Sequence, residues 1–325
     1  MSRILERLDE LYAIGATRIG YSPEEDAAHE LAARWLAEAG LEVETDRAGN
    51  TFGRRGDAEL WLGSHLDTVP NGGRFDGALG VVAAIEVAEQ VDVPLVVVAF
   101  RDEERSCAGS RACVEDGRLP GAFLELHIEQ GPVLARAGAA LGIVTAIVGQ
   151  ARGDVVFEGR ADHAGTTPMD ARKDALVDAA VFVLRARDSA GPDAVVTVGR
   201  LVVEPGATNV VPARVTASVD VRAPTSAELE RLIASLGFEP SYRTEPVAMG
   251  GRPLAALREA AAGAPELVSG AGHDAGILAA AGVPAGMLFV RSLNGGVSHS
   301  PDERSSPEDI AQALDVLTEA VRIIS

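Results

Sequence analysis

Residues 60–68 read Leu-Trp-Leu-Gly-Ser-His-Leu-Asp-Thr, a short apolar run that ends in polar side chains. The run Leu60–Leu62 is apolar enough to be a strand buried on both faces of a parallel or mixed sheet. His65 then follows at the carboxyl end of this strand, where open α/β sheets place their ligands. Because residues two apart point the same way in an extended chain, Asp67 is placed to orient the His65 ring.

The same pattern continues on both sides of this segment. Pro94–Phe100 and Phe123–Ile128 are two further apolar runs of strand length, and Ala78–Gln90 has the composition of a crossover helix. Near the end of the chain, Gly286–Val290 is again strand-like, and Ser306-Pro307-Glu308-Asp309 opens a last helix with a capping hydroxyl and a first-turn proline. Strands that alternate with helices predict an α/β fold with a mixed, helix-flanked sheet.

The middle of the chain has a different texture. Its strands alternate polar and apolar residues, which predicts a sheet covered by helices on one side only. The predicted strands and helices are Asp154–Glu158, Val195–Val202, Arg214–Arg222, Arg172–Arg187 and Ser226–Leu236. We therefore expect a smaller α+β domain over residues 148–254, inserted into a discontinuous domain made of residues 1–147 and 255–325.

Charge and composition exclude several classes of function. The chain of 325 residues has a formal net charge of -19, whereas nucleic acids and anionic membranes are bound through clustered Lys and Arg. No segment is apolar for long enough to span a bilayer, and residues 1–14 are amphipathic rather than signal-like, so we expect a cytoplasmic protein. G-x-S-x-G, P-loop and G-x-G-x-x-G motifs are missing, which argues against a serine hydrolase and against nucleotide chemistry.

The histidines are the first sign of a metal site. Five of the six lie in short segments rich in Asp, Glu, Gly and Ser, namely His65, His127, His163, His273 and His299. The sixth, His29, lies on a helix that starts near Ala27, and we expect it to be partly exposed. One such histidine would more often be structural than a ligand, but five together favour metal binding.

Carboxylates accompany these histidines at the predicted strand ends. Asp76 follows the flexible loop Gly72-Gly73-Arg74-Phe75, and Glu103 and Glu104 follow the strand that ends at Phe100. Such acids are commonly turn residues or solvated loops, yet beside histidines two adjacent glutamates suit one metal ligand and one general base. The set suits two divalent ions that share a bridging carboxylate. Nitrogen and oxygen ligands without a thiolate suit zinc, manganese, cobalt or nickel.

Three further residues suit an anionic or amide-containing substrate. The Arg222 guanidinium offers a bidentate fork for a carboxylate, and Asn209 can add a hydrogen-bond donor. Taken alone, Arg222 at a strand end would more often form an ordinary surface ion pair. Gln130 offers a side-chain amide that can both donate and accept hydrogen bonds.

Nine segments carry a resemblance to a known family. They are GSHLDTV, GGRFDGALGV, DEE, LELHIEQGPVL, GRADHAGTTPMDARKDA, PGATNVVPARV, DVR, SGAGHDA and SHSPDE. In this order, over nearly the whole chain, they resemble the M20 amidohydrolases of the hydantoinase and carbamoylase type. The resemblance implies a zinc-peptidase-like catalytic domain with an inserted lid and dimerisation domain, and therefore a homodimer.

The resemblance also implies roles for individual residues. The implied metal ligands are His65 and His127 for one ion, Glu104 and His299 for the other, and Asp76 as the bridge. Glu103 would be the general base, with Asp67 as the orienter of His65. The implied substrate-binding residues are Gln130, His163, Asn209 and Arg222, and His163 would stabilise the oxyanion of a neighbouring subunit.

The expected activity is metal-dependent hydrolysis of a linear C–N bond in a ureido or amide substrate with a carboxylate, such as an N-carbamoyl-L-amino acid or allantoate. Two alternatives stay open: an aminopeptidase or dipeptidase of the same family, and a non-catalytic binding protein that kept the fold. The connector from Glu104 to His127 and the lid near Gly237–Gly263 are more compact than in the family, which leaves the size of the pocket open. His273 and Asp274 could serve either buried hydrogen bonding or substrate contact.

Overall fold

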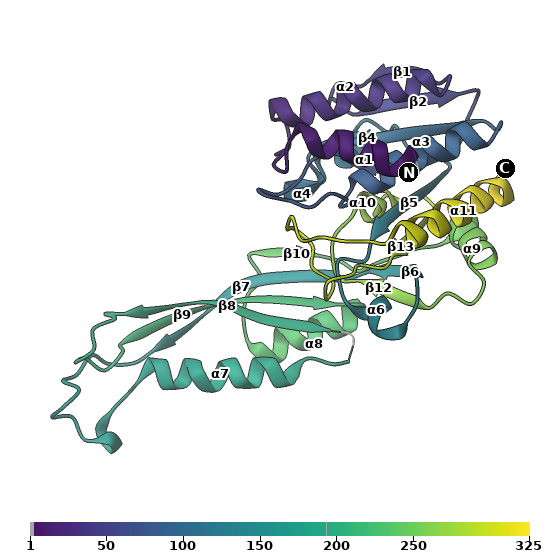
Figure 1. Ribbon diagram of the computed structural model, residues 1–325. Coiled ribbons are helices and arrows are strands. Elements are labelled where there is room, and N and C mark those ends of the chain that lie inside the picture. Colours follow the sequence, from purple (N-terminus) through teal and green to yellow (C-terminus); the bar gives the residue numbers. More distant parts are fainter. Residues whose placement is uncertain (1–2, 193) are drawn as a thin grey trace. The chain divides into compact units, whose positions relative to one another are not determined.

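The computed structural model describes residues 3–192 and 194–325, which form two compact units (Figure 1). The larger unit contains the described residues up to Ile147 together with Ala248–Ser325, and the smaller unit contains Val148–Val247. We expected the chain to return to the larger domain at residue 255, but it returns at Ala248. The reason is that Met249 already joins the larger unit, because its N–H donates to the Thr145 carbonyl at 2.9 Å.

The larger unit is built on a mixed sheet. In order across the sheet, the strands are β1 (Glu42–Thr45), β2 (Thr51–Arg55), β4 (Leu95–Phe100), β3 (Leu60–His65), β5 (Ala122–Ile128), β13 (Ala285–Val290), β6 (Leu141–Ile147) and β11 (Val247–Ala248), while β12 (Glu266–Ser269) also pairs with β6. The neighbours β4, β3, β5 and β13 are parallel, and each of them is buried throughout. The expected buried strands of a mixed sheet are thus confirmed, and the carboxyl ends of β3, β4 and β5 meet at one edge.

The helices of this unit begin where local sequence favours them. They are α1 (Arg3–Ile14), α2 (Pro23–Glu38), α3 (Ala78–Gln90), α4 (Glu103–Ser106), α5 (Ala108–Glu115), α6 (Val133–Ala137), α9 (Gly251–Ala260), α10 (Asp274–Ala280) and α11 (Pro307–Ile324). At the start of α11, Ser306 Oγ accepts the Asp309 N–H at 3.0 Å, as the sequence predicts. α2 starts earlier than expected, at Pro23, because Ser22 caps it in the same way. Among the described residues, no helix has the length and apolar character needed to cross a membrane.

The smaller unit is an antiparallel sheet with helices on one face (Figure 1). Its strands, in order, are β10 (Tyr242–Thr244), β7 (Gly149–Glu158), β9 (Arg214–Ala223) and β8 (Val195–Glu204), and its helices are α7 (Ala175–Ser189), α8 (Ser226–Leu236) and the short 3-10 helix η1 (Met169–Ala171). β9 alternates buried and half-buried residues along its whole length, and Phe182 and Leu232 pack on its buried side. α7 begins later than expected because the Asp174 side chain caps it.

His29 is buried, so the expectation of a partly exposed ring is wrong. It lies on α2 with 5% of its surface exposed, and its Nδ1 is 2.9 Å from Thr51 Oγ1 on β2. Burial is the main cause that lowers the pKa of His29 to about 3, with a further contribution from Arg101. The ring is therefore neutral in the folded protein at neutral pH.

This burial predicts a specific loss of stability in acid. The unfolded chain binds a proton on His29 below about pH 6.5 while the folded chain does not, so the free energy of unfolding falls as the pH drops from about 6.5 toward 3. At pH 5 the contribution is about 2 kcal/mol. Urea unfolding should be measured at pH 7 and at pH 5, with a chelator present to remove effects of bound metal. The free energy of unfolding should fall between these pH values in the wild-type protein, and it should fall by less in His29→Gln. Equal losses in both proteins would contradict the assignment.

Candidate metal centre

Two histidines from adjacent strands point their Nε2 atoms at one carboxylate. His65 ends β3, and its Nδ1 lies 3.2 Å from both the carbonyl and Oδ1 of Asp67. His127 lies near the end of β5, and its Nδ1 donates to the Ile128 carbonyl at 2.9 Å. Because these partners are acceptors, Nδ1 carries the proton in each ring and Nε2 can present a lone pair. The two Nε2 atoms lie 3.7 Å and 3.1 Å from Asp76 Oδ1.

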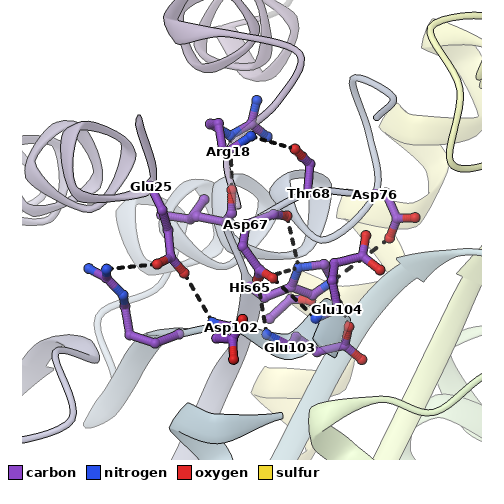
Figure 2. Close-up of polar contacts among 12 residues, drawn as sticks. Arg18, Glu25, His65, Asp67, Thr68, Asp76, Asp102, Glu103 and Glu104 are labelled. Atoms are coloured by element: carbon purple, nitrogen blue, oxygen red, sulfur yellow. Dashed lines mark hydrogen bonds and ion pairs between the residues drawn. The ribbon is translucent and has the colours of Figure 1, made fainter. Parts of the chain in front are cut away.

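Asp67 also holds the segment that follows β4. Its Oδ1 accepts the Glu103 N–H at 3.0 Å, and its Oδ2 accepts the Glu104 N–H at 3.1 Å. Figure 2 shows Asp67 close to His65, Glu103 and Glu104, with dashed lines that mark these contacts. One buried carboxylate therefore fixes the ring of the predicted ligand His65 and the backbone of Glu103, the predicted base, and of Glu104, a predicted ligand.

Asp76 belongs to two groups of side chains whose ligand atoms could share an ion. The first group is His65, Asp76 and His127, which are all buried. The second is Asp76, Glu104 and His299, in which His299 Nε2 lies 3.3 Å from Glu104 Oε2 and 3.5 Å from Asp76 Oδ2. The two oxygens of Asp76 thus face different groups, which is the geometry of a bridging ligand.

The electrostatics of this pocket suit cations. Burial lowers the pKa of His65, but the charges of Glu103, Asp67 and Asp76 raise it by more, so the pocket favours positive charge there. A metal ion supplies such a charge and displaces the proton. Within the described parts of the chain, His65 Nε2, His127 Nε2 and Glu104 Oε1 are buried and accept or donate no hydrogen bond, which is unfavourable unless another group binds them. The residues present therefore fit a metal centre.

The predicted base Glu103 has the environment that a base needs. Burial is the main cause that raises the pKa of Glu103 well above its ordinary value, and Asp274 and Glu104 add to it, while His65 opposes it. A glutamate with a raised pKa can both accept and return a proton near neutral pH. At the rim, a hydrogen bond to Glu104 raises the pKa of the half-exposed His299 to about 8.

Strained backbone is concentrated at this site. Asp102, Gln130 and His299 all have positive φ angles, of 53°, 56° and 56°, although none is glycine. Such conformations cost about 1–2 kcal/mol each and persist where the surroundings hold them. Here the left-handed Gln130 and His299 have their side chains toward Asp76, and the left-handed Asp102 precedes Glu103, which faces His65.

Gln130 contacts Asp76, the predicted bridging ligand, directly. Its Nε2 donates to Asp76 Oδ2 at 2.8 Å, whereas its Oε1 is buried and has no hydrogen-bond donor among the described residues. The free oxygen is therefore an acceptor available to an N–H group of a ligand.

The predicted residues His273 and Asp274 lie next to His127, one of the predicted metal ligands. The His273 ring packs edge-on against His127 with centroids 4.5 Å apart, and its Nε2 is 2.9 Å from Ser269 Oγ. Asp274 Oδ1 accepts the Ser110 hydroxyl at 2.6 Å. Glu125, His127 and His273 form a third group whose ligand atoms lie close together. In this group, both oxygens of Glu125 already accept hydrogen bonds, one from Ser64 Oγ and the other from the Ala275 N–H. His273 and one oxygen of Asp274 are thus held by buried hydrogen bonds, whereas Asp274 Oδ2 has no hydrogen-bond partner among the described residues.

In the smaller unit, His163 and Asn209 lie together. His163 pairs with Val210 in a β-bridge, and the Ala164 N–H donates to the Asn209 carbonyl at 3.0 Å. The His163 Nδ1 accepts the N–H groups of Gly165 and Thr166, so its Nε2 carries a proton and is a hydrogen-bond donor. This exposed ring therefore has the tautomer that an oxyanion requires.

Arg222 lies at the opposite end of that sheet. β9 starts at Arg214 next to the loop that holds Asn209, whereas Arg222 pairs with Val195 and Gln150 at the far end. Eight residues of strand separate Arg214 from Arg222, which is about 26 Å at roughly 3.3 Å per residue. The structure therefore does not bring Asn209 and Arg222 of one chain to the same carboxylate. Arg222 Nε lies 3.1 Å from Asp220 Oδ1.

Two buried glutamates at the site were missed from the sequence. Glu25 on α2 accepts the Asp102 N–H at 3.0 Å and pairs with Arg101 at 2.7 Å. Glu303 accepts the N–H groups of Phe75 and Asp76. Burial first, and then the charge of Asp76, raise the pKa of Glu303 to about 7. The only sequence signals were a capping-box pattern at Ser22–Glu25 and the acid that closes the segment SHSPDE.

Comparison with known proteins identifies the chain as a hydrolase of a known family. Residues 61–323 match the profile of Peptidase family M20/M25/M40. The chain is 37% identical to an N-carbamoyl-L-amino acid amidohydrolase of Geobacillus stearothermophilus over 98% of its length and 97% of that protein. It is 35% identical to an allantoate amidohydrolase of Bacillus subtilis (strain 168), covering 94% of this chain and 92% of that one.

A solved structure is similar over the same extent. It is an amidase of the hydantoinase/carbamoylase family from Burkholderia multivorans, with a TM-score of 0.86, 32% identity and coverage of 98% of this chain and 96% of that one. The chain belongs to peptidase family M20/M25/M40, whose members depend on metals. The alignment to the Geobacillus protein extends over 399 positions, more than the 325 residues of this chain, so that protein has segments that this one lacks.

Substitution of two glycines tests whether metal binding depends on the close approach of the His65 ring to the loop that carries Asp76. Gly77 has φ 63°, and a Cβ there would lie 2.4 Å from the His65 ring, whereas Gly138 has φ 67° and open space around it. Both substitutions to alanine carry similar backbone strain, of about 1–2 kcal/mol. Gly77→Ala should weaken Zn²⁺ binding by about 10–100-fold, measured by competition with a chelating dye, and Gly138→Ala should not. Equal affinities would contradict the predicted role of His65.

Proposed function

We propose that this protein is a two-metal amidohydrolase that cleaves a ureido C–N bond in a small substrate with a carboxylate, such as an N-carbamoyl-L-amino acid or allantoate. The observation that carries the proposal is the pair of side-chain groups that share Asp76, with Glu103 beside them. The relatives' names support the substrate class. The same names argue against the peptidase alternative.

In the proposed centre, each residue of the larger unit has one task. His65, His127 and Asp76 hold one divalent ion, and Asp76, Glu104 and His299 hold the other, with zinc or manganese as the suited metals. Bound ions of this kind act as Lewis acids toward the carbonyl and promote the ionisation of water at neutral pH. Asp67 does not bind an ion but keeps His65 and the glutamates in place.

Proton transfer and charge stabilisation follow from the residues described. Glu103 accepts a proton from the attacking water and returns it to the leaving nitrogen, which its raised pKa allows. The Nε2–H of His163 donates to the oxyanion that forms at the carbonyl. The free Oε1 of Gln130 accepts from an N–H of the ureido group, which distinguishes such substrates from esters.

The distance within the smaller unit supports a site that is built from two protomers. About 26 Å of strand between Arg222 and the His163–Asn209 end is much longer than an N-carbamoyl amino acid. We therefore propose that Arg222 binds the substrate carboxylate in one site of a homodimer, while His163 and Asn209 of the same chain serve the other site.

The surface of the smaller unit supports such a dimer. α7 exposes Val177, Val181 and Leu184 at helical spacing, with 57%, 62% and 54% of their surfaces accessible. β8 is an edge strand of its sheet, and its Val195 and Leu201 are also exposed. An apolar stripe and a strand edge on one small unit favour pairing with a second copy of the chain.

The substrate class is tested by release of ammonia from a panel of compounds. Metal-loaded protein should release ammonia from an N-carbamoyl-L-amino acid, N-carbamoyl-β-alanine or allantoate, and excess chelator should abolish the reaction. Glu103→Gln should keep metal and substrate binding but lower kcat by about 10²–10⁴-fold, because the amide cannot accept the proton. The exposed Glu115→Gln is the matched control. Cleavage of dipeptides alone would refute the proposed substrate class.

The shared site is tested by mixing two inactive variants. Glu103→Gln and His163→Ala should each be nearly inactive alone. After unfolding and refolding together they should recover roughly a quarter of wild-type activity, since half of the dimers are mixed and each of these has one intact site. If His163 served its own chain, every site would carry a defect and the mixture would stay inactive.

A further inference from the structure

Glu303 is a buried acid on the segment that carries His299. Only 6% of its surface is exposed, although Asp302 and Arg304 on either side of it are exposed. The chain turns here, because the Glu303 N–H donates to the Ser300 carbonyl at 3.0 Å. The turn directs the Glu303 carboxylate inward, to a loop that is more than two hundred residues earlier in the sequence.

One oxygen of Glu303 holds the backbone of the loop that carries Asp76. Its Oε1 accepts the N–H of Phe75 at 2.6 Å and the N–H of Asp76 at 3.0 Å. A Cβ at Gly73 would lie 2.3–2.4 Å from this carboxylate, so the close approach requires glycine at that position. The loop is thus shaped around the glutamate.

The other oxygen reaches the Asp76 side chain through a hydroxyl. Ser298 Oγ lies 3.1 Å from Glu303 Oε2 and 3.0 Å from Asp76 Oδ2. Asp76 Oδ2 is the oxygen that faces His299 and Glu104. Glu303 and Ser298 therefore fix both the backbone and the side chain of Asp76, and they do so from the segment that also holds His299.

Stability of the fold gives no reason to place a carboxylate here. The group loses its hydration, and it lies beside the like charge of Asp76, so both effects disfavour its charged form. An apolar side chain of similar size would avoid both of these costs. What the carboxylate adds is a rigid acceptor for two neighbouring N–H groups and a partner for the hydroxyl that orients Asp76.

We propose that Glu303 is a positioning residue of the metal centre, which acts with Ser298 to keep Asp76 and His299 at the spacing that a shared pair of ions requires. This inference rests on the proposed function, because it assumes that Asp76 and His299 bind metal. Glu303 itself binds no ion in this proposal, and its effect is on the affinity and geometry of the centre.

The test measures metal binding directly. Co²⁺ is titrated into metal-free protein, the visible absorption spectrum reports the geometry of the centre, and calorimetry reports the affinity of each ion. Glu303→Ala should weaken binding of at least one ion by about 10–100-fold and change the spectrum. Glu303→Gln should restore most of the affinity, because its amide oxygen can still accept both N–H groups. Asp302→Ala, an exposed acid on the same turn, is the control and should bind as wild type does.

The outcomes separate this inference from the proposed function. If wild type binds no Co²⁺, the proposed function and the inference both fail. If wild type binds two ions and Glu303→Ala binds them with the same affinity and spectrum, the inference alone fails. Should Glu303→Ala not fold, Ser298→Ala decides: weaker binding with an altered spectrum supports the inference, and wild-type binding overturns it.

Discussion

The carboxylate of Asp67 is the interaction on which the site depends. It is fully buried and accepts from the N–H groups of Glu103 and Glu104 while it faces the Nδ1 of His65. The ends of β3 and β4 are thereby joined by one side chain. Burial disfavours a charged carboxylate, but the His65 hydrogen bond and the two backbone donors outweigh this and lower the pKa of Asp67. A neutral group of the same shape could accept from only one of the two glutamate N–H groups.

Much of the larger unit could be predicted because its signals are local. Apolar runs such as Pro94–Phe100 end in charged residues, and a parallel sheet brings the ends of such runs to one edge. The histidines and acids at those ends could be grouped without knowledge of their distances. His29 shows the limit of such predictions. Its position on a helix does not indicate that β2 covers it, or that its ring forms a hydrogen bond with the Thr51 hydroxyl. Whether a polar side chain is buried depends on the hydrogen-bond partner that the fold brings to it.

The residues that could not be predicted act over long distances in sequence. Glu25 follows the pattern of a local helix cap, yet its carboxylate also binds the Asp102 N–H and so supports the left-handed turn before Glu103. Nothing near residue 25 in the sequence indicates this partner. The separation of Arg222 from Asn209 has a different origin, because it follows from the length of β9, which runs extended from Arg214 past Arg222. Motif residues indicate a chemistry, but the strands between them decide which of them can meet.

Charge balance connects these contacts to the proposed centre. Asp67, Asp76, Glu103 and Glu104 bring four carboxylates to one pocket, while the tautomers of His65 and His127 make both rings neutral ligands. Two divalent ions carry as much positive charge as these four groups carry negative charge. The carboxylates around His65 outweigh burial and raise its pKa, and burial raises the pKa of Glu103, so both groups favour their protonated forms. In the proposed centre, binding of a metal ion would therefore release protons, and its affinity would fall in acid.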